Sequence, residues 1–113
     1  MPAQMRRNGD TAVVGLEGRL SLGEPVEEFR QLWNEALASG VKNLVVNLSE
    51  VTMMDSSGIG TMIRCHSAVM QQGGKLRLVG PNSTVRQAFK ITRLDNVFEF
   101  HESEESALAA SAS

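Results

Sequence analysis

The sequence predicts an α/β fold, and three successive patterns support that prediction. The apolar, β-branched run Leu44-Val45-Val46-Asn47-Leu48 is typical of a buried strand. Apolar residues at helical spacing come after it and stop at Gly73-Gly74, where a helix can end. The stretch Lys75–Gly80 then supplies another strand. Such a β-α-β succession requires a right-handed crossover between adjacent parallel strands.

The size and composition of the chain fit one globular domain. With 113 residues, of which 42% are apolar, the chain can build a modest hydrophobic core. We expect a single domain over residues 1–113, with residues 109–113 frayed at the end. A net charge of −2 with mixed signs gives no basic surface for nucleic acid, so we expect no direct DNA or RNA binding.

The N-terminal residues and the single cysteine bear on location. Residues 1–7 lack the apolar stretch of a signal peptide, and no apolar run approaches the length that crosses a bilayer. We therefore expect a cytoplasmic protein that does not insert into a membrane. Cys65 has no second cysteine with which to form an internal disulfide, which agrees with a reducing compartment.

A hairpin and a helix are predicted in the first third of the chain. Asn8-Gly9-Asp10 is a turn between a short leading strand and the extended segment Thr11–Leu20. Ser21 and Glu24 have the spacing of a capping box, and Pro25 suits the first turn of a helix. The inward face of this helix is formed by Val26, Phe29, Leu32, Trp33, Ala36 and Leu37.

The last third of the chain predicts a helix, a strand and a terminal helix. Pro81-Asn82-Ser83 is a turn and cap before a short helix, in which the residues expected to face inward are Val85, Ala88, Phe89 and Ile91. The stretch Val97–Phe100 has the pattern of a last strand. A terminal helix begins after it near Glu102, with acidic residues in its first turn.

The most informative stretch joins the central strand, Val41–Leu48, to the helix that ends near Gln72. We expect a loop over Val51–Gly60, followed by a helix that buries Ile59, Met62, Ile63, Val69 and Met70. In an α/β sheet, such a loop lies beyond the carboxyl end of a strand, where ligands and partners commonly bind. The candidate binding loop consists of Met54, Asp55, Ser56, Ser57, Gly58 and Gly60.

The chemistry of this loop suits either a helix cap or a modified site. Asp and Ser are favoured where a helix starts, because its first N–H groups lack partners within the helix. The same positive end of a helix accommodates a phosphate. By residue type alone a cap is the commoner role, but two hydroxyls after Asp55 exceed what one cap requires. Gly58 and Gly60 would leave the first turn open, so that a partner can approach Ser56 and Ser57.

No residue pattern indicates a catalytic or metal site. Cys65, His66 and His101 lack the spacing of metal ligands. We expect Cys65 to be buried or half-buried, His66 to be packed with a hydrogen bond and His101 to be exposed. The sequence contains neither a Gly-x-Ser-x-Gly elbow nor a Gly-x-x-x-x-Gly-Lys phosphate loop. No base is marked that would activate Ser56 as a nucleophile. We expect no enzyme activity, no catalytic residue, no metal and no cofactor.

Two segments of the chain resemble a known family. The segment Met54–Gly60, preceded by Asn47-Leu48 and followed by Gly73-Gly74-Lys75-Leu76, resembles the STAS domain of bacterial anti-sigma-factor antagonists. The downstream segment Val85–Phe98 resembles the third helix of that family and the strand after it. The resemblance covers nearly the whole chain. It implies a single STAS-like domain with a mixed central β-sheet flanked by about four helices.

The resemblance also implies a function in partner switching. In this family the unphosphorylated antagonist binds an anti-sigma factor that is also a serine kinase, and thereby frees the sigma factor. The kinase uses ATP to phosphorylate the serine directly after the loop aspartate, and a PP2C-type phosphatase removes the phosphate. By position, the phosphorylated serine of this chain is Ser56, between Asp55 and Ser57.

One segment departs from the family pattern. Many relatives have an acidic residue just after the leucine that corresponds to Leu20, whereas Ser21-Leu22-Gly23 follows here. This segment borders the partner surface in the family fold, so the departure bears on the identity of the partner.

Two other functions compete with a phosphorylated antagonist. STAS-like domains also serve lipid or anion transporters, in which the loop would be a docking surface without phosphorylation. A neighbouring gene for an ABC-transporter ATPase would favour that role. The residues give little support to a small hydrolase, which would be indicated by ester turnover that is lost in Ser56→Ala.

Overall fold

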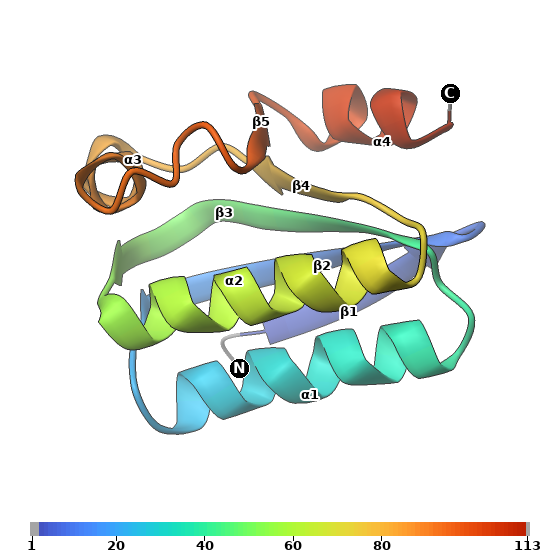
Figure 1. The fold of residues 1–113 in the computed structure, drawn as a ribbon, viewed down its shortest axis with the longest axis horizontal. Coiled ribbons are helices and arrows are strands. Elements are labelled where there is room, and N and C mark those ends of the chain that lie inside the picture. Colours follow the sequence, from blue (N-terminus) through green and yellow to red (C-terminus); the bar gives the residue numbers. More distant parts are fainter. Residues whose placement is uncertain (1–2, 113) are drawn as a thin grey trace.

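The fold combines a five-stranded sheet with four helices (Figure 1). The computed structural model describes residues 3–112. The elements are β1 (Ala3–Asn8), β2 (Thr11–Leu20), α1 (Glu24–Ala38), β3 (Asn43–Met54), α2 (Ser56–Gln71), β4 (Leu76–Val79), α3 (Ser83–Ile91), β5 (Glu99–His101) and α4 (Glu104–Ala112). The predicted hairpin and the predicted β-α-β unit of β3, α2 and β4 are present.

The sheet is mixed, and its strand order follows the sequence from β1 to β5. β1 and β2 are antiparallel, while β2 with β3, β3 with β4, and β4 with β5 are parallel. Helices α1 and α2 lie side by side on one face, and α4 covers the other (Figure 1). α3 lies near the distal part of β3, at the end of the molecule where α2 begins (Figure 1). The predicted α/β fold, with a mixed sheet and four helices, is confirmed.

Two apolar clusters hold these layers together. The larger cluster packs α1, α2 and α3 against the sheet, and its fully buried large side chains include Phe29, Leu44, Met62 and Phe89. The smaller cluster lies under α4 and consists of Val13, Val45, Val79 and Ala107, with Leu108 partly buried against it. The alternation of side chains along a strand explains why Val45 belongs to one cluster and its neighbours Leu44 and Val46 to the other.

The central strand extends further than the sequence predicted. β3 continues through Ser49-Glu50 to Met54, so the expected loop over Val51–Gly60 is wrong and only Asp55 separates the strand from α2. Two register shifts against β2 each place one extra residue on β3. These shifts leave the polar Ser49-Glu50 exposed without ending the pairing, which the sequence pattern did not reveal.

Several apolar residues assigned to the core are exposed instead. Ile63 and Met70 of α2 are 43% and 52% exposed, and Ile91 of α3 is 71% exposed. At 100° per residue, each lies more than about 100° from the centre of its helix's buried stripe. Val97, predicted to start the last strand, is also exposed, and β5 begins only at Glu99. Recurrence of apolar residues at helical spacing is therefore not enough to place each of them in the core.

The start of α1 and the end of α4 also differ from expectation. The N-cap of α1 is Gly23, with no side-chain cap, so the predicted capping box of Ser21 and Glu24 is wrong, although Pro25 lies in the first turn as expected. Residues 109–112, which we expected to fray, are helical, because α4 continues to Ala112. Ser111 in its last turn accepts a hydrogen bond from Arg77 Nη1 at 3.0 Å and donates one to the Ala107 carbonyl. Ser113 lies outside the described residues.

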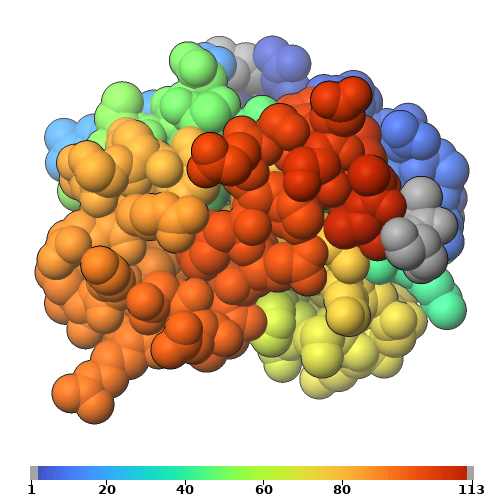
Figure 2. Space-filling view, turned by 90° about the horizontal axis from the view of Figure 1, so that it is seen from above, coloured from blue at the N-terminus to red at the C-terminus, as the bar shows by residue number. Residues whose placement is uncertain are grey.

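Polar contacts attach α4 to the sheet (Figure 2 shows α4 on the surface). Arg77, which is only 6% exposed, donates to Glu99, and His101 bridges Glu99 and Ser106. The His101 side chain is 15% exposed, which corrects the expectation that it would be exposed. Asn47 donates to Glu104 at 2.7 Å, and Arg6 pairs with the same carboxylate.

These carboxylates make stability depend on pH. The hydrogen bond from Asn47, followed by that from Arg6, holds the pKa of Glu104 below its ordinary value of 4.5. The hydrogen bond from His101, with Arg77 adding to it, likewise lowers the pKa of Glu99. A lowered pKa in the folded state contributes stability that is present above pH 4.5 and is lost as pH falls through the folded-state value.

We therefore expect the free energy of unfolding to decrease as the pH is lowered below about 4.5. Urea denaturation over a pH series measures this slope. Glu104→Gln should make the acid slope shallower than in Glu105→Gln, since both residues lie in the first turn of α4 but only Glu104 contacts the sheet. Equal acid slopes in the two variants would contradict this assignment.

Candidate functional site

The candidate site lies where three segments meet at the carboxyl end of the parallel strands. The end of β3 pairs with the end of β2, and Leu20 is aligned with Met54. The Asp55 backbone N–H donates to the Leu20 carbonyl at 3.4 Å. Asn82, which caps α3, donates from Nδ2 to the Val51 carbonyl at 3.0 Å. The end of β3, which leads into α2, is thus bonded to the end of β2 on one side and to the cap of α3 on the other.

Asp55 is the N-cap of α2. Its Oδ1 accepts a hydrogen bond from the Gly58 N–H at 3.0 Å, and its own carbonyl accepts from the Ile59 N–H at 3.0 Å. An aspartate at this position also complements the partial positive charge of the helix start. The expectation of a helix cap is therefore confirmed for Asp55.

The two serines after Asp55 do not cap the helix. Ser56 is exposed, and Ser57 is half-buried. Among the residues that the structure describes, neither hydroxyl has a side-chain hydrogen bond. Ser56 therefore presents a solvent-accessible hydroxyl at the first position of a helix, one residue after the capping carboxylate.

The other residues of the predicted loop have internal roles. Met54 is 7% exposed and belongs to the main core, so it offers little surface to a partner. Gly58 is buried, and a Cβ there would collide with the Leu20 carbonyl oxygen, so this glycine allows α2 to pack against β2. Its predicted role of leaving space for a partner is wrong. Gly60 is half-buried, and a Cβ there would meet only Arg64 Nη1, at 3.7 Å.

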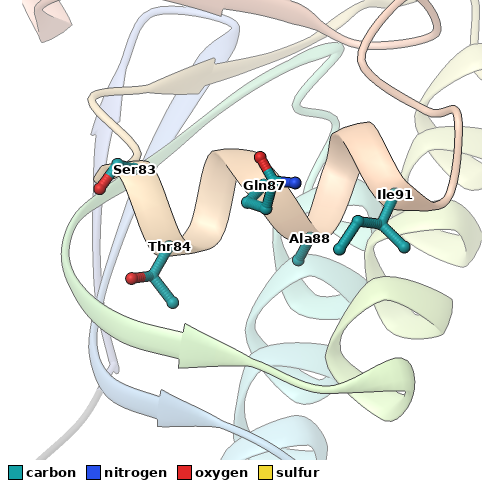
Figure 3. Close-up of a pocket in the computed structure, with 5 residues that line it drawn as sticks. All are labelled: Ser83, Thr84, Gln87, Ala88 and Ile91. Carbon is teal, nitrogen blue, oxygen red and sulfur yellow. The ribbon is translucent and has the colours of Figure 1, made fainter.

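Two large apolar side chains are exposed in the turn before α1 and on α3. Leu22, in the turn between β2 and α1, is 79% exposed, and Ile91 of α3 is 71% exposed. Thr84, Ala88 and Ile91 project from one side of α3 into an open groove of about 530 Å³ (Figure 3). The angular position of Ile91 on its helix could have marked it as exposed, whereas nothing in the local sequence distinguishes Leu22 from a core leucine.

The possible metal ligands of the described residues are not gathered into one site. No cluster of three or more His, Cys, Asp or Glu within residues 3–112 could hold a metal ion. Cys65 is fully buried as predicted, and burial raises the pKa of its thiol. His66 is half-buried with its ring 5.2 Å from that of Phe98, but the expected side-chain hydrogen bond is not found in the described part of the chain. No helix there is both long and apolar enough to span a bilayer.

A comparison with known families agrees with this geometry. The family model described as the STAS domain matches residues 2–107. The chain belongs to the STAS domain family. The resemblance predicted from Met54–Gly60 and Val85–Phe98 is thereby confirmed, and the STAS match extends over both segments.

Curated relatives of this STAS domain include proteins named as anti-sigma factor antagonists. The chain is 28% identical over 80 residues to the anti-sigma-B factor antagonist of Staphylococcus aureus strain NCTC 8325, an alignment that covers 71% of this chain and 74% of the relative. Its alignments with three curated relatives span 63% to 74% of their lengths.

Solved STAS structures have the same fold. The unphosphorylated form of the anti-sigma factor antagonist SpoIIAA superposes with a TM-score of 0.81 and 27% identity, covering 94% of this chain and 92% of that chain. Phosphorylated SpoIIAA of Bacillus gives a TM-score of 0.76 at 25% identity, covering 96% and 97%. A STAS domain protein of Planctomyces limnophilus gives 0.86 at 20% identity, covering 98% of both chains, which is a likeness of fold.

Proposed function

We propose that this STAS domain is an anti-sigma-factor antagonist whose partner binding is switched by phosphorylation of Ser56. The observation that carries the proposal is the exposed Ser56 hydroxyl at the first position of α2, directly after the capping Asp55. The unphosphorylated protein binds an anti-sigma factor that is also a serine kinase, and so releases the sigma factor for transcription. A PP2C-type phosphatase restores the binding form.

The relatives support this proposal in two ways. The Staphylococcus aureus relative is named as an antagonist of an anti-sigma factor, which is a regulatory binding protein. SpoIIAA has been solved in both an unphosphorylated and a phosphorylated form, and this chain superposes on both. The fold thus accommodates both forms in a related protein, and we assign the same pair of states to this chain.

The local chemistry favours a change in surface charge on phosphorylation, without refolding of the domain. A phosphoserine carries about 1.5 to 2 negative charges near neutral pH. At position 56 the start of α2 supplies unpaired N–H groups and partial positive charge, which stabilise that phosphate within the protein. A partner packed on the exposed surface around Ser56 would instead meet added bulk and negative charge beside Asp55.

The protein supplies a substrate hydroxyl rather than catalytic groups. The active site for phosphate transfer belongs to the kinase, and Asp55 positions the helix start through its hydrogen bond to Gly58. We therefore assign the protein a regulatory role in the cytoplasm, with no cofactor of its own.

Phosphate mapping after reaction with the cognate kinase and ATP tests the proposal. Tandem mass spectrometry of proteolytic peptides should find one phosphate on Ser56 in the wild-type protein and in Ser57→Ala. It should find no phosphate in Ser56→Ala. Ser57→Ala is the matched control because it removes the neighbouring hydroxyl of the same turn. Phosphate on Ser57, or stable binding without any phosphate transfer, would contradict the proposal; the latter fits a transport accessory protein.

A further inference from the structure

Helix α4 is attached to the sheet mainly by polar contacts. Among the side chains of α4 whose burial the structure describes, Ala107 alone is fully buried, whereas α1 and α2 bury five and six residues. Apolar burial is proportional to the area removed from water, so α4 gains less from it than the other long helices. The polar side-chain contacts of α4 with the sheet include Glu104 with Asn47 and Arg6, Ser106 with His101, and Ser111 with Arg77.

One of these contacts is made by Asn47, at the point in β3 where the strand pairing changes. Asn47 donates from Nδ2 to Glu104 Oε2 at 2.7 Å. Its Oδ1 accepts from the Ser49 N–H at 2.9 Å and from the Ser49 hydroxyl at 2.6 Å. The amide of Asn47 thus links the first turn of α4 to the backbone of β3 two residues further along.

β3 changes its pairing at Asn47. This residue is the last of β3 that is aligned with β4, opposite Val79. On the other side, the register against β2 shifts directly after the pair of Gly15 and Asn47, where β3 gains an extra residue. Beyond this point the distal half of β3, residues 48–54, is paired with β2 alone. Such an irregularity bends and re-aims the strand that carries it.

The distal half of β3 leads directly to the phosphorylation site. Met54 is its last residue, Asp55 caps α2, and Ser56 follows. Because a strand transmits its direction to the element that follows it, the irregularity at Asn47 contributes to where the start of α2 lies, in addition to the contacts with the Leu20 carbonyl.

We propose that α4 is a releasable strap that fixes the bend of β3 and so positions Ser56 for its protein partners. Glu104 and Asn47 are positioning residues, since they act through β3 and do not touch the Ser56 hydroxyl. When α4 lifts from the sheet, the Ser49 backbone loses its fixed acceptor and the distal half of β3 opens with α4. This proposal rests on the proposed function only for the role of Ser56. The coupling between α4 and residues 48–54 does not depend on that role.

Amide hydrogen exchange read by NMR on the full chain tests the strap without any kinase. Glu104→Ala removes the acceptor of the Asn47 amide, and Glu105→Ala is the matched control in the same helical turn. We expect Glu104→Ala to speed exchange about tenfold, the effect of one hydrogen bond to a charged group, in both α4 and residues 48–54. The amides of Val45 and Val46 should keep their wild-type rates.

Two further variants distinguish local release of α4 from a general loss of stability of the domain. Glu104→Gln keeps an oxygen that can accept from Asn47, and should restore most of the protection. Asn47→Asp keeps the acceptor for Ser49 but loses the donor to Glu104, and should reproduce the Glu104→Ala pattern. Faster exchange confined to α4, or an equal change throughout β3, would overturn the proposal. A failure to find phosphate on Ser56 would leave this result unchanged, so the two proposals fail separately.

Discussion

Ser56→Asp should bind the anti-sigma partner at least about thirtyfold more weakly than the wild-type protein. An unpaired charge held in an interface costs about 2 to 5 kcal/mol, which corresponds to a loss of affinity from roughly thirtyfold to several thousandfold. Aspartate carries less charge than phosphate and is shorter, so the substitution should fall toward the lower end of that range. The thermal midpoint should change little, because an acidic side chain suits the start of a helix.

Titration calorimetry with the purified partner measures this loss. Ser67→Asp is the matched control, since it adds the same charge to an exposed position of the same helix, away from its start. Ser56→Ala removes the hydroxyl without adding charge and should bind as the wild-type protein does. If Ser56→Asp and Ser67→Asp weaken binding equally, the effect comes from net charge and the role assigned to Ser56 is wrong.

Gly58→Ala should destabilise the fold by about 1 to 3 kcal/mol, the usual cost of forcing extra volume into a packed site. The added Cβ would meet the Leu20 carbonyl oxygen, which is part of the backbone and cannot turn aside as a flexible side chain can. This contact holds α2 against the end of β2, next to the hydrogen bond from Asp55 to the same carbonyl. The start of α2 would therefore have to shift.

Gly60→Ala is the matched substitution for Gly58→Ala, two residues further along the same helix. Its Cβ would meet only the end of the flexible Arg64 side chain, and alanine is the better helix former by about 0.5 to 1 kcal/mol. Urea denaturation should thus give opposite signs for the two variants. Equal stabilisation by both would show that α2 does not pack against Leu20 as described.

The features that the sequence predicted are those with a local physical signal. Apolar, β-branched runs and turn residues predicted the hairpin and the parallel β-α-β unit. The acid at the start of a helical pattern predicted the cap at Asp55 and the exposed hydroxyl of Ser56. The STAS resemblance depended on the same short segment, which explains why fold and candidate site were found together.

The features that the sequence missed depend on contacts between distant segments. Ser49-Glu50 is polar and therefore suggested the end of a strand, yet pairing with β2 carries β3 onward to Met54. Gly58 was predicted to leave space for a partner. A glycine is required there because the helix packs against the backbone of Leu20, 38 residues earlier in the chain. α4 looked weakly helical at its end, while the buried Arg77 holds its last turn through Ser111.

The measurement that tests the central claim most directly is the dissociation constant of one anti-sigma partner for the same protein before phosphorylation, after it, and after treatment with a PP2C-type phosphatase. We predict tight binding, a loss of roughly thirtyfold to several thousandfold, and full recovery. The same dissociation constant in all three states, with phosphate verified on Ser56 in the second, would contradict the account.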